Sequence, residues 1–96
     1  MSENMQPNFL VENHAIRLRA EDGSVLAEVT FPACGEGVVD INHTFVDPSL
    51  RGQGMAGKLL DACAHELERT DRRARPTCSY AVGWFEKHPE WAHLLA

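Results

Sequence analysis

The sequence is short of the residues that would indicate a disulfide framework, a metal centre or a membrane span. Its 96 residues hold three cysteines, an odd number, with no Cys-x-x-Cys spacing and no Cys/His ligand pattern. No apolar run approaches the roughly 18 residues of a transmembrane helix, and the polar segment 1–7 does not resemble a signal peptide. We therefore expect a cytoplasmic protein with reduced thiols, no bound metal and no membrane association.

Positive charge is also scarce. Nine Lys and Arg stand against 14 Asp and Glu, a net charge of −5, so the broad basic surface that nucleic acid requires is absent. The 44% hydrophobic and 24% charged residues are ordinary for a globular protein. At this length we expect a flexible N-terminus over 1–7 and a single domain over 8–96, acting as a monomer or weak homodimer.

Alternating apolar and polar residues predict three successive antiparallel strands. The alternation runs over 15–20, 25–31 and 38–46. An Asp-Gly pair between the first two ranges is typical of a hairpin turn, and 9–12 could add a short edge strand. In the third range the alternation places His43 on the same face as Ile41 and Phe45.

The period changes to that of a helix from Gly54 onward. The apolar stripe consists of Leu59, Leu60, Cys63, Ala64 and Leu67. We expect this helix to fade in 70–73, followed by an extended segment at 75–79, a second helix at 80–87 and a last turn at 90–95. The order predicts an α+β (mixed α/β) fold, with one mostly antiparallel sheet and two to three helices.

Three glycines stand where the first helix begins, in the stretch VDPSLRGQGMAGKLL (46–60). The first N–H groups of a helix lack internal partners and carry the positive end of its dipole, so bare glycine backbone there can admit a phosphate. The alternative is that the glycines serve only a tight turn and close packing. A P-loop is excluded because Lys58 is followed by Leu59 rather than Ser or Thr, and the dinucleotide-binding spacing is matched only weakly.

The same stretch carries a specific resemblance. Residues 51–56 (RGQGMA) match the [QR]xxGx[GA] pattern of the GNAT superfamily of acetyl-CoA-dependent N-acetyltransferases. The Ile-x-His-Thr of 41–44, the Cys-Ser-aromatic of 78–80 and the Glu-Lys-His-Pro-Glu of 86–90 resemble the small single-domain N-acetyltransferase-like subfamily. The resemblance covers about 25–95.

The resemblance implies a compact fold whose sheet is splayed at the cofactor, without the N-terminal helix pair of larger members. The loop 51–57 would wrap the pyrophosphate of coenzyme A, and the extended segment 75–79 would form the other side of the cleft. The implied cofactor-binding residues are Phe45, Val46, Arg51, Gly52, Gln53, Gly54, Met55, Ala56, Gly57 and Lys58. Lys87 and His88 are further candidates for contact with the 3′-phosphate.

Three side chains are candidates for the chemistry of acetyl transfer. Cys78 could take the acetyl group as a nucleophile, or be a small buried hydrophobe. His43 could act as a base or activate the cysteine, or be a hydrogen-bonded core histidine. Tyr80 could protonate the leaving thiolate, or only pack. Of the other cysteines, Cys63 belongs to the helix core and Cys34 to a loop.

The leading hypothesis is an N-acetyltransferase that binds acetyl-CoA and transfers its acetyl group to an unidentified small amine or protein amine. The transfer could be direct or pass through Cys78. Glu28 and Asp40, on neighbouring strands, could relay protons, or simply be solvated. The alternative is an acyl-CoA-binding or sensing module with little turnover, which the missing helix pair favours. A generic nucleotide-binding or structural domain is a third possibility.

Overall fold

The computed structural model describes residues 7–96, so the expected flexible segment 1–7 lies, apart from Pro7, outside the described residues. The elements in chain order are β1 (Leu10–Val11), β2 (Ala15–Arg19), β3 (Val25–Thr30), β4 (Ala33–Gly35), β5 (Val38–Val39), β6 (His43–Val46), η1 (Pro48–Leu50), α1 (Met55–Arg69), β7 (Arg73–Ala74), α2 (Ser79–Lys87) and η2 (Pro89–Leu94).

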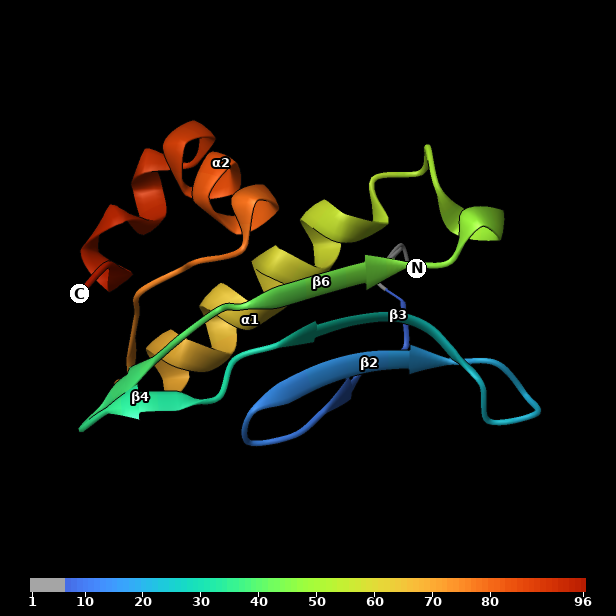
Figure 1. Ribbon diagram of the computed structural model, residues 1–96, viewed down its shortest axis with the longest axis horizontal. Coiled ribbons are helices and arrows are strands. Elements are labelled where there is room, and N and C mark those ends of the chain that lie inside the picture. Colours follow the sequence, from blue (N-terminus) through green and yellow to red (C-terminus); the bar gives the residue numbers. More distant parts are fainter. Residues whose placement is uncertain (1–6) are drawn as a thin grey trace, which may run out of the picture.

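The strands form two small sheets. The first has the order β1-β2-β3-β6 and is antiparallel throughout. The second has the order β4-β5-β7, in which β5 and β7 run parallel. In Figure 1, α1 crosses behind the first sheet, while α2 and η2 lie together beyond the sheet at one end. This is the predicted α+β fold with three principal helical segments.

The core lies between the sheets and α1, and it also includes buried side chains of α2 and η2. Its largest fully buried side chains are Phe31, Ile16, Ile41, Leu59, Leu60, Leu67, Val29 and Val39. All five residues of the predicted helical stripe are buried, including Cys63. The period-3.6 pattern therefore identified the face that α1 turns to the sheet.

The predicted single strand 38–46 is wrong, because the chain there divides between the two sheets. His43 pairs with Thr30, while the N–H of Asn42 also donates to the Thr30 carbonyl. Asn42 and His43 therefore both oppose Thr30, as in a β-bulge. After the bulge, each side chain points to the opposite face of the sheet from the one that the alternation predicts. Ile41 before the bulge is buried, whereas His43 after it is exposed. The expected shared face of Ile41, His43 and Phe45 is therefore also wrong.

The expected strand 75–79 needs a smaller correction. The strand proper is β7, which ends at Ala74, and residue 79 already belongs to α2. The N–H groups of Arg73, Arg75 and Thr77 donate in turn to the carbonyls of residues 37, 39 and 41, at 2.9, 2.8 and 3.1 Å. This parallel ladder continues to Ile41, after which β6 and the segment leading to α2 diverge. The expected splay of the sheet is confirmed.

The turn between β1 and β2 and the position of Cys34 bear on two further expectations. Between β1 and β2 the described chain makes only a short turn at 12–14, so no helix pair stands there. Cys34, expected in a loop, lies in β4 and is exposed. Within residues 7–96, no helix is both long and apolar enough to cross a membrane.

Candidate functional site

The connection from β6 to α1 is held in place by its own polar groups. The carboxylate of Asp47 accepts hydrogen bonds from the N–H and the hydroxyl of Ser49, at 2.9 and 2.6 Å, and so caps η1. These bonds hold the pKa of the Asp47 carboxyl below its usual range. The Nε of Arg51 donates to the carbonyl of Val46 at 3.0 Å and ties the loop to the end of β6.

Glycine is required at two positions of this loop. Gly52 has φ +83° and Gly54 has φ +74°, a region that side-chain-bearing residues rarely adopt. Gly54 is the N-cap of α1, and its carbonyl accepts from Lys58 N–H at 3.1 Å. No side chain caps the helix, and within the described chain no group accepts a hydrogen bond from the N–H groups of 55–57. The positive end of α1 is therefore free to bind an anion.

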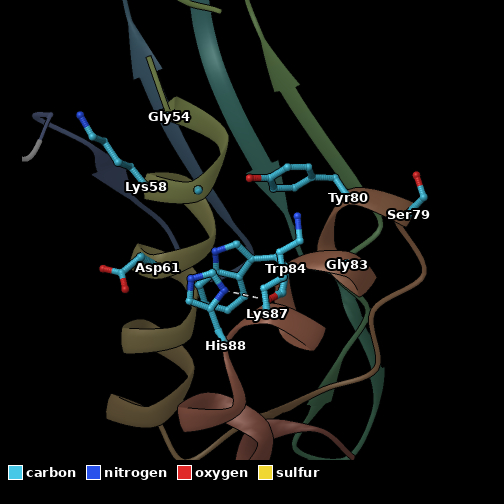
Figure 2. A pocket seen from close by; sticks show the side chains of 10 residues that line it. Gly54, Lys58, Asp61, Ser79, Tyr80, Gly83, Trp84, Lys87 and His88 are labelled. Carbon is cyan, nitrogen blue, oxygen red and sulfur yellow. Dashed lines mark hydrogen bonds between the residues drawn. The ribbon is translucent and has the colours of Figure 1, made fainter. Parts of the chain in front are cut away.

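Two adjoining clefts open at this helix start. The larger one, about 500 Å³, lies between α1 and α2 (Figure 2) and is lined by Gly54, Gly57, Lys58, Asp61, Ser79, Tyr80, Gly83, Trp84, Lys87 and His88. The smaller one, about 180 Å³, is lined by Val46, Leu50, Arg51, Gly52, Gly54, Met55, Ala56, Gly57 and Tyr80. Gly54, Gly57 and Tyr80 line both, so the clefts meet at the first turn of α1.

Tyr80 stands at this junction. Figure 2 shows its side chain extending from the start of α2 toward α1. Its hydroxyl would lie 3.6 Å from a Cβ added at Gly57. Burial raises the pKa of Tyr80, which keeps the hydroxyl protonated and available as a hydrogen-bond donor near neutral pH.

Cys78 is the N-cap of α2 and is half buried. Its N–H donates to the Ile41 carbonyl at 3.0 Å, and its Sγ lies 3.6 Å from Oγ1 of Thr44. Burial on its own would raise the pKa of the thiol. Interactions with the N–H of Ala81, the Thr44 hydroxyl, and the N–H groups of Tyr80 and Thr44 outweigh it, and hold that pKa below its usual range.

His43 lies on the other face of the sheet from Cys78. Thr44, beside the thiol, pairs with Val29 and shares its buried face, so the preceding side chain must point outward. There Nε2 of His43 is 3.4 Å from the Glu28 carboxylate, which also accepts from Nε of Arg17 at 2.8 Å. The structure therefore does not bring His43 and Cys78 together.

The remaining predicted residues divide between the clefts and their surroundings. Those that line a cleft are Val46, Arg51, Gly52, Gly54, Met55, Ala56, Gly57, Lys58, Tyr80, Lys87 and His88. Phe45 and Gln53 line neither, and Cys78 lies directly before the cleft residues Ser79 and Tyr80. Gly83 also lines the larger cleft, and no feature of the sequence analysis gave it a site role. The glycine inside a predicted helix was the signal that could have identified this position.

The described residues contain no group of three or more His, Cys, Asp or Glu side chains arranged to hold a metal ion. The titratable groups near the helix starts are instead single side chains, among them Lys58, Cys78 and Tyr80, beside the free backbone N–H groups of 55–57. Such a site can bind an anionic ligand and present a thiol and a phenol to it.

A family model described as GCN5-related N-acetyltransferase matches residues 15–94. The chain belongs to this family. It is also 32% identical over 63 residues to Protein NATD1 of Bos taurus, an alignment that covers 66% of this chain and 56% of that protein. The chain thus spans little more than half the length of this relative.

Solved structures share the GNAT fold. A GCN5-like N-acetyltransferase from Staphylococcus aureus, so described, superposes with a TM-score of 0.77 over 97% of this chain and 91% of that one, at 22% identity. A ribosomal-protein-alanine N-acetyltransferase from Brucella melitensis superposes with a TM-score of 0.58 at 20% identity, over 76% of this chain and 60% of that one. A protein of Klebsiella pneumoniae described as an acyl-CoA N-acyltransferase superposes with a TM-score of 0.54 at 25% identity, over 65% of this chain and 43% of that one.

Proposed function

We propose that this protein transfers an acetyl group from acetyl-CoA to an amine, and that it holds the pyrophosphate of the donor at the start of α1. One observation carries the proposal. Between β6 and α1, two glycines with positive φ expose the unbonded N–H groups of 55–57 to a pair of adjoining clefts. Family membership supports an acyl-CoA as the anion that fills them.

The pantetheine arm would follow the free edge of β6. This strand pairs with β3 on one side and has no partner strand on the other within the described sheet. Val46, at its end, lines the smaller cleft. An arm bound along this edge would bring the thioester toward Thr44 and Cys78, where the two halves of the sheet diverge.

Two routes of transfer fit this arrangement. In the direct route the amine nitrogen attacks the thioester carbon, the carbon–sulfur bond breaks, and the CoA thiolate takes a proton from Tyr80. The proton that the amine nitrogen loses passes through water and restores the phenol. In the covalent route the Cys78 thiolate attacks first and releases CoA, and the amine then attacks the S-acetyl group and regenerates the thiolate. The lowered pKa of Cys78 supports the second route.

His43 has a narrower possible role than the sequence suggested. Its separation from Cys78 gives no support to activation of the thiol. As a base for an amine, it would serve an acceptor that approaches from the outer face of the sheet, where Glu28 is its partner. This role stays a prediction.

A second candidate function is acyl-CoA binding or sensing without appreciable turnover. The observation that favours it is the short turn between β1 and β2, because no described helix covers the outer face of the sheet beside β6. The described residues therefore provide few walls for an acceptor pocket.

Ligand binding, turnover and the covalent route can be tested in order. A thermal shift with CoA, and none with ATP or NAD, is expected if the clefts bind the donor; the absence of a CoA shift would contradict both candidate functions. Thiol release from acetyl-CoA across an amine panel would establish transfer, and its absence would favour the binding module. Intact-protein mass spectrometry should then find an acetyl adduct that Cys78→Ala abolishes and Cys34→Ser retains, if the covalent route operates.

A further inference from the structure

The face of the sheets that is turned away from α1 carries a polar patch at the point where the two sheets diverge. Val29, Val39 and Ile41 are buried in the core, so the side chains that alternate with them point outward. Together with the outward-facing histidine of β6 they form a group that we call the outer patch. It consists of Glu28, Thr30, Asp40, Asn42, His43 and Thr77.

Two hydrogen bonds join the strands that carry the outer patch. The hydroxyl of Thr30 donates to Oδ1 of Asn42 at 2.6 Å, and the hydroxyl of Thr77 donates to Oδ1 of Asp40 at 2.7 Å. Thr77 directly precedes Cys78, whose thiol lies on the other face of the sheet. The outer patch and the thiol therefore lie on opposite sides of the same point of divergence.

The surface of the outer patch is open rather than hollowed. Its residues line neither of the two clefts at α1, nor a third cleft of about 310 Å³ at the far end of that helix. Asn42, His43 and Thr77 are exposed, so no described element covers them. Sites for small molecules enclose most of their ligand in a concave pocket. An open strand surface suits instead a ligand that is itself part of a larger surface.

The charges of the outer patch favour a cation beside His43. The carboxylate of Glu28 accepts from Nε of Arg17 at 2.8 Å, and Arg17 also pairs with Glu12 at 2.8 Å, so two carboxylates surround one guanidinium. Asp40 forms no ion pair with any described residue. The excess of negative charge at this end of the patch attracts an ammonium group.

Arg75 makes the opposite border of the outer patch positive. Its side chain shares the face of Thr77, because the two residues are two positions apart in the extended segment before α2. Arg75 is exposed, and none of the carboxylates in the described chain forms an ion pair with it. A ligand that fits both ends of the patch therefore carries an ammonium and an acidic group, spaced along an extended chain.

We propose that the acceptor of the acetyl group is a lysine side chain of a protein, presented on an extended segment that lies across the outer patch. The ammonium lies at Glu28 and Asp40, and an acidic side chain of the same segment lies at Arg75. The flexible four-carbon stem of the lysine lets its nitrogen pass through the divergence to the thioester. The proposal rests on the proposed function, because it names the acceptor of that transfer. The bonds formed and broken are those of the two transfer routes, with the lysine nitrogen as the attacking amine.

The acceptor class is tested with a lysine-centred peptide library that has blocked termini and random flanking residues. The matched small amine is Nα-acetyl-lysine methylamide, which carries the same side chain without the segment, and spermidine is a second small amine. With saturating acetyl-CoA, wild type should acetylate the library with a kcat/KM about tenfold or more above that of either small amine. Mass-spectrometric sequencing of the products should show enrichment of Asp or Glu near the lysine.

Two substitutions test the contacts separately. Arg75→Gln should abolish the enrichment of acidic residues, whereas Arg19→Gln, an equal charge change at the hairpin between β2 and β3, should retain it. Asp40→Asn keeps an oxygen for the Thr77 hydroxyl but removes the charge. It should raise KM for the library several-fold, whereas loss of a proton relay at Asp40 would lower kcat. An unshifted pH midpoint for alkylation of Cys78 would show that the segment carrying the thiol has not moved.

The outcomes separate this inference from the proposed function. If CoA binds but neither the library nor a small amine is acetylated, the proposed transfer is contradicted and the inference falls with it. If a small amine is acetylated as efficiently as the library, the transfer stands and only the inference is overturned. Acetylated peptides without acidic enrichment, or an enrichment that survives Arg75→Gln, would overturn the placement of the segment across the outer patch.

Discussion

The two long helices both begin without a side-chain cap, but they use their free N–H groups differently. α1 starts at Gly54 in the left-handed conformation, and its first N–H groups open onto the two clefts. α2 starts at Cys78 in the extended region, with φ −68° and ψ 128°, and the N–H groups of its first turn face the thiol. η1, by contrast, is capped by the carboxylate of Asp47.

The difference shows how one electrostatic feature can serve two purposes. The positive end of a helix stabilises any nearby negative charge. At α1 a glycine N-cap leaves the N–H groups open to a ligand, whereas at α2 the N–H groups face the Cys78 thiol and help to lower its pKa. Substitutions at the two helix starts should therefore have different effects on ligand binding and on thiol reactivity.

The largest effect is expected at Gly54. Gly54→Ala forces a Cβ into the left-handed region, which costs about 1–2 kcal/mol of stability, and puts a methyl group where a phosphate oxygen must approach the backbone. We expect CoA affinity to fall by about tenfold or more. Urea unfolding and calorimetry measure the two effects. Gly54→Asn tolerates the left-handed backbone, so it should recover stability but not affinity. Full CoA affinity in either variant would contradict an anion site at α1.

Gly57 should separate stability from binding in a single variant. Its backbone is helical and a Cβ there meets only an ordinary contact, so Gly57→Ala should stabilise the protein by up to about 1 kcal/mol. The same methyl group narrows the junction of the two clefts, and CoA affinity should fall several-fold. A variant that gains stability and binds CoA unchanged would show that this glycine has no ligand-related role.

The thiol at the start of α2 should react as a partly ionised group. In a Cys34→Ser background, iodoacetamide should label Cys78 with a pH midpoint below that of a free cysteine measured under the same conditions. Cys63 is the internal control, because burial raises its pKa to about 12 and it should remain unlabelled in the folded protein. Thr44→Val removes one partner of the sulfur and should move the Cys78 midpoint upward. A midpoint at or above that of a free cysteine would contradict the account of α2.

The smallest effect is expected at the capped start of η1. Asp47→Ala should lower the urea midpoint slightly at pH 7 and leave CoA affinity nearly unchanged. Because the folded pKa of Asp47 is depressed, its contribution is present above the unfolded pKa and is lost as the pH falls below about 4. The urea midpoints of the wild-type and Asp47→Ala proteins should therefore converge at acidic pH. A large loss of CoA affinity would mean that η1 is part of the binding site.

Local patterns in the sequence predicted the elements better than their relative positions. The stripe from Leu59 to Leu67 predicted α1 because a helical face depends only on residues three and four apart. The glycines of 52–57 predicted a turn into a helix start for the same reason. The prediction of a single strand over 38–46 was wrong because of the bulge at Asn42 and His43. The bulge leaves the alternation in the sequence plausible but reverses which face of the sheet each later side chain occupies. Nothing in that alternation marks the reversal.

The larger cleft shows a second limit. Gly83 and Trp84 line it together with Gly57 and Asp61, which lie more than twenty positions earlier in the chain. The packing of α2 against α1 brings these residues together, and the spacing of residues within either helix does not predict that packing. Activation of Cys78 by His43 was one reading of the sequence, but the two residues lie on opposite faces because the bulge at Asn42 and His43 turns the histidine outward.

If the start of α1 binds the pyrophosphate of CoA, the backbone N–H groups there must respond to the ligand. An amide-resolved NMR titration of the isotopically labelled protein with CoA would show this response. We expect saturable shifts that are largest for the backbone N–H groups of 52–57, with smaller shifts at the start of α2 and none at Arg17 and Glu28 on the outer face. Saturable binding that leaves 52–57 unshifted, or the absence of binding, would contradict an anion site at the start of α1.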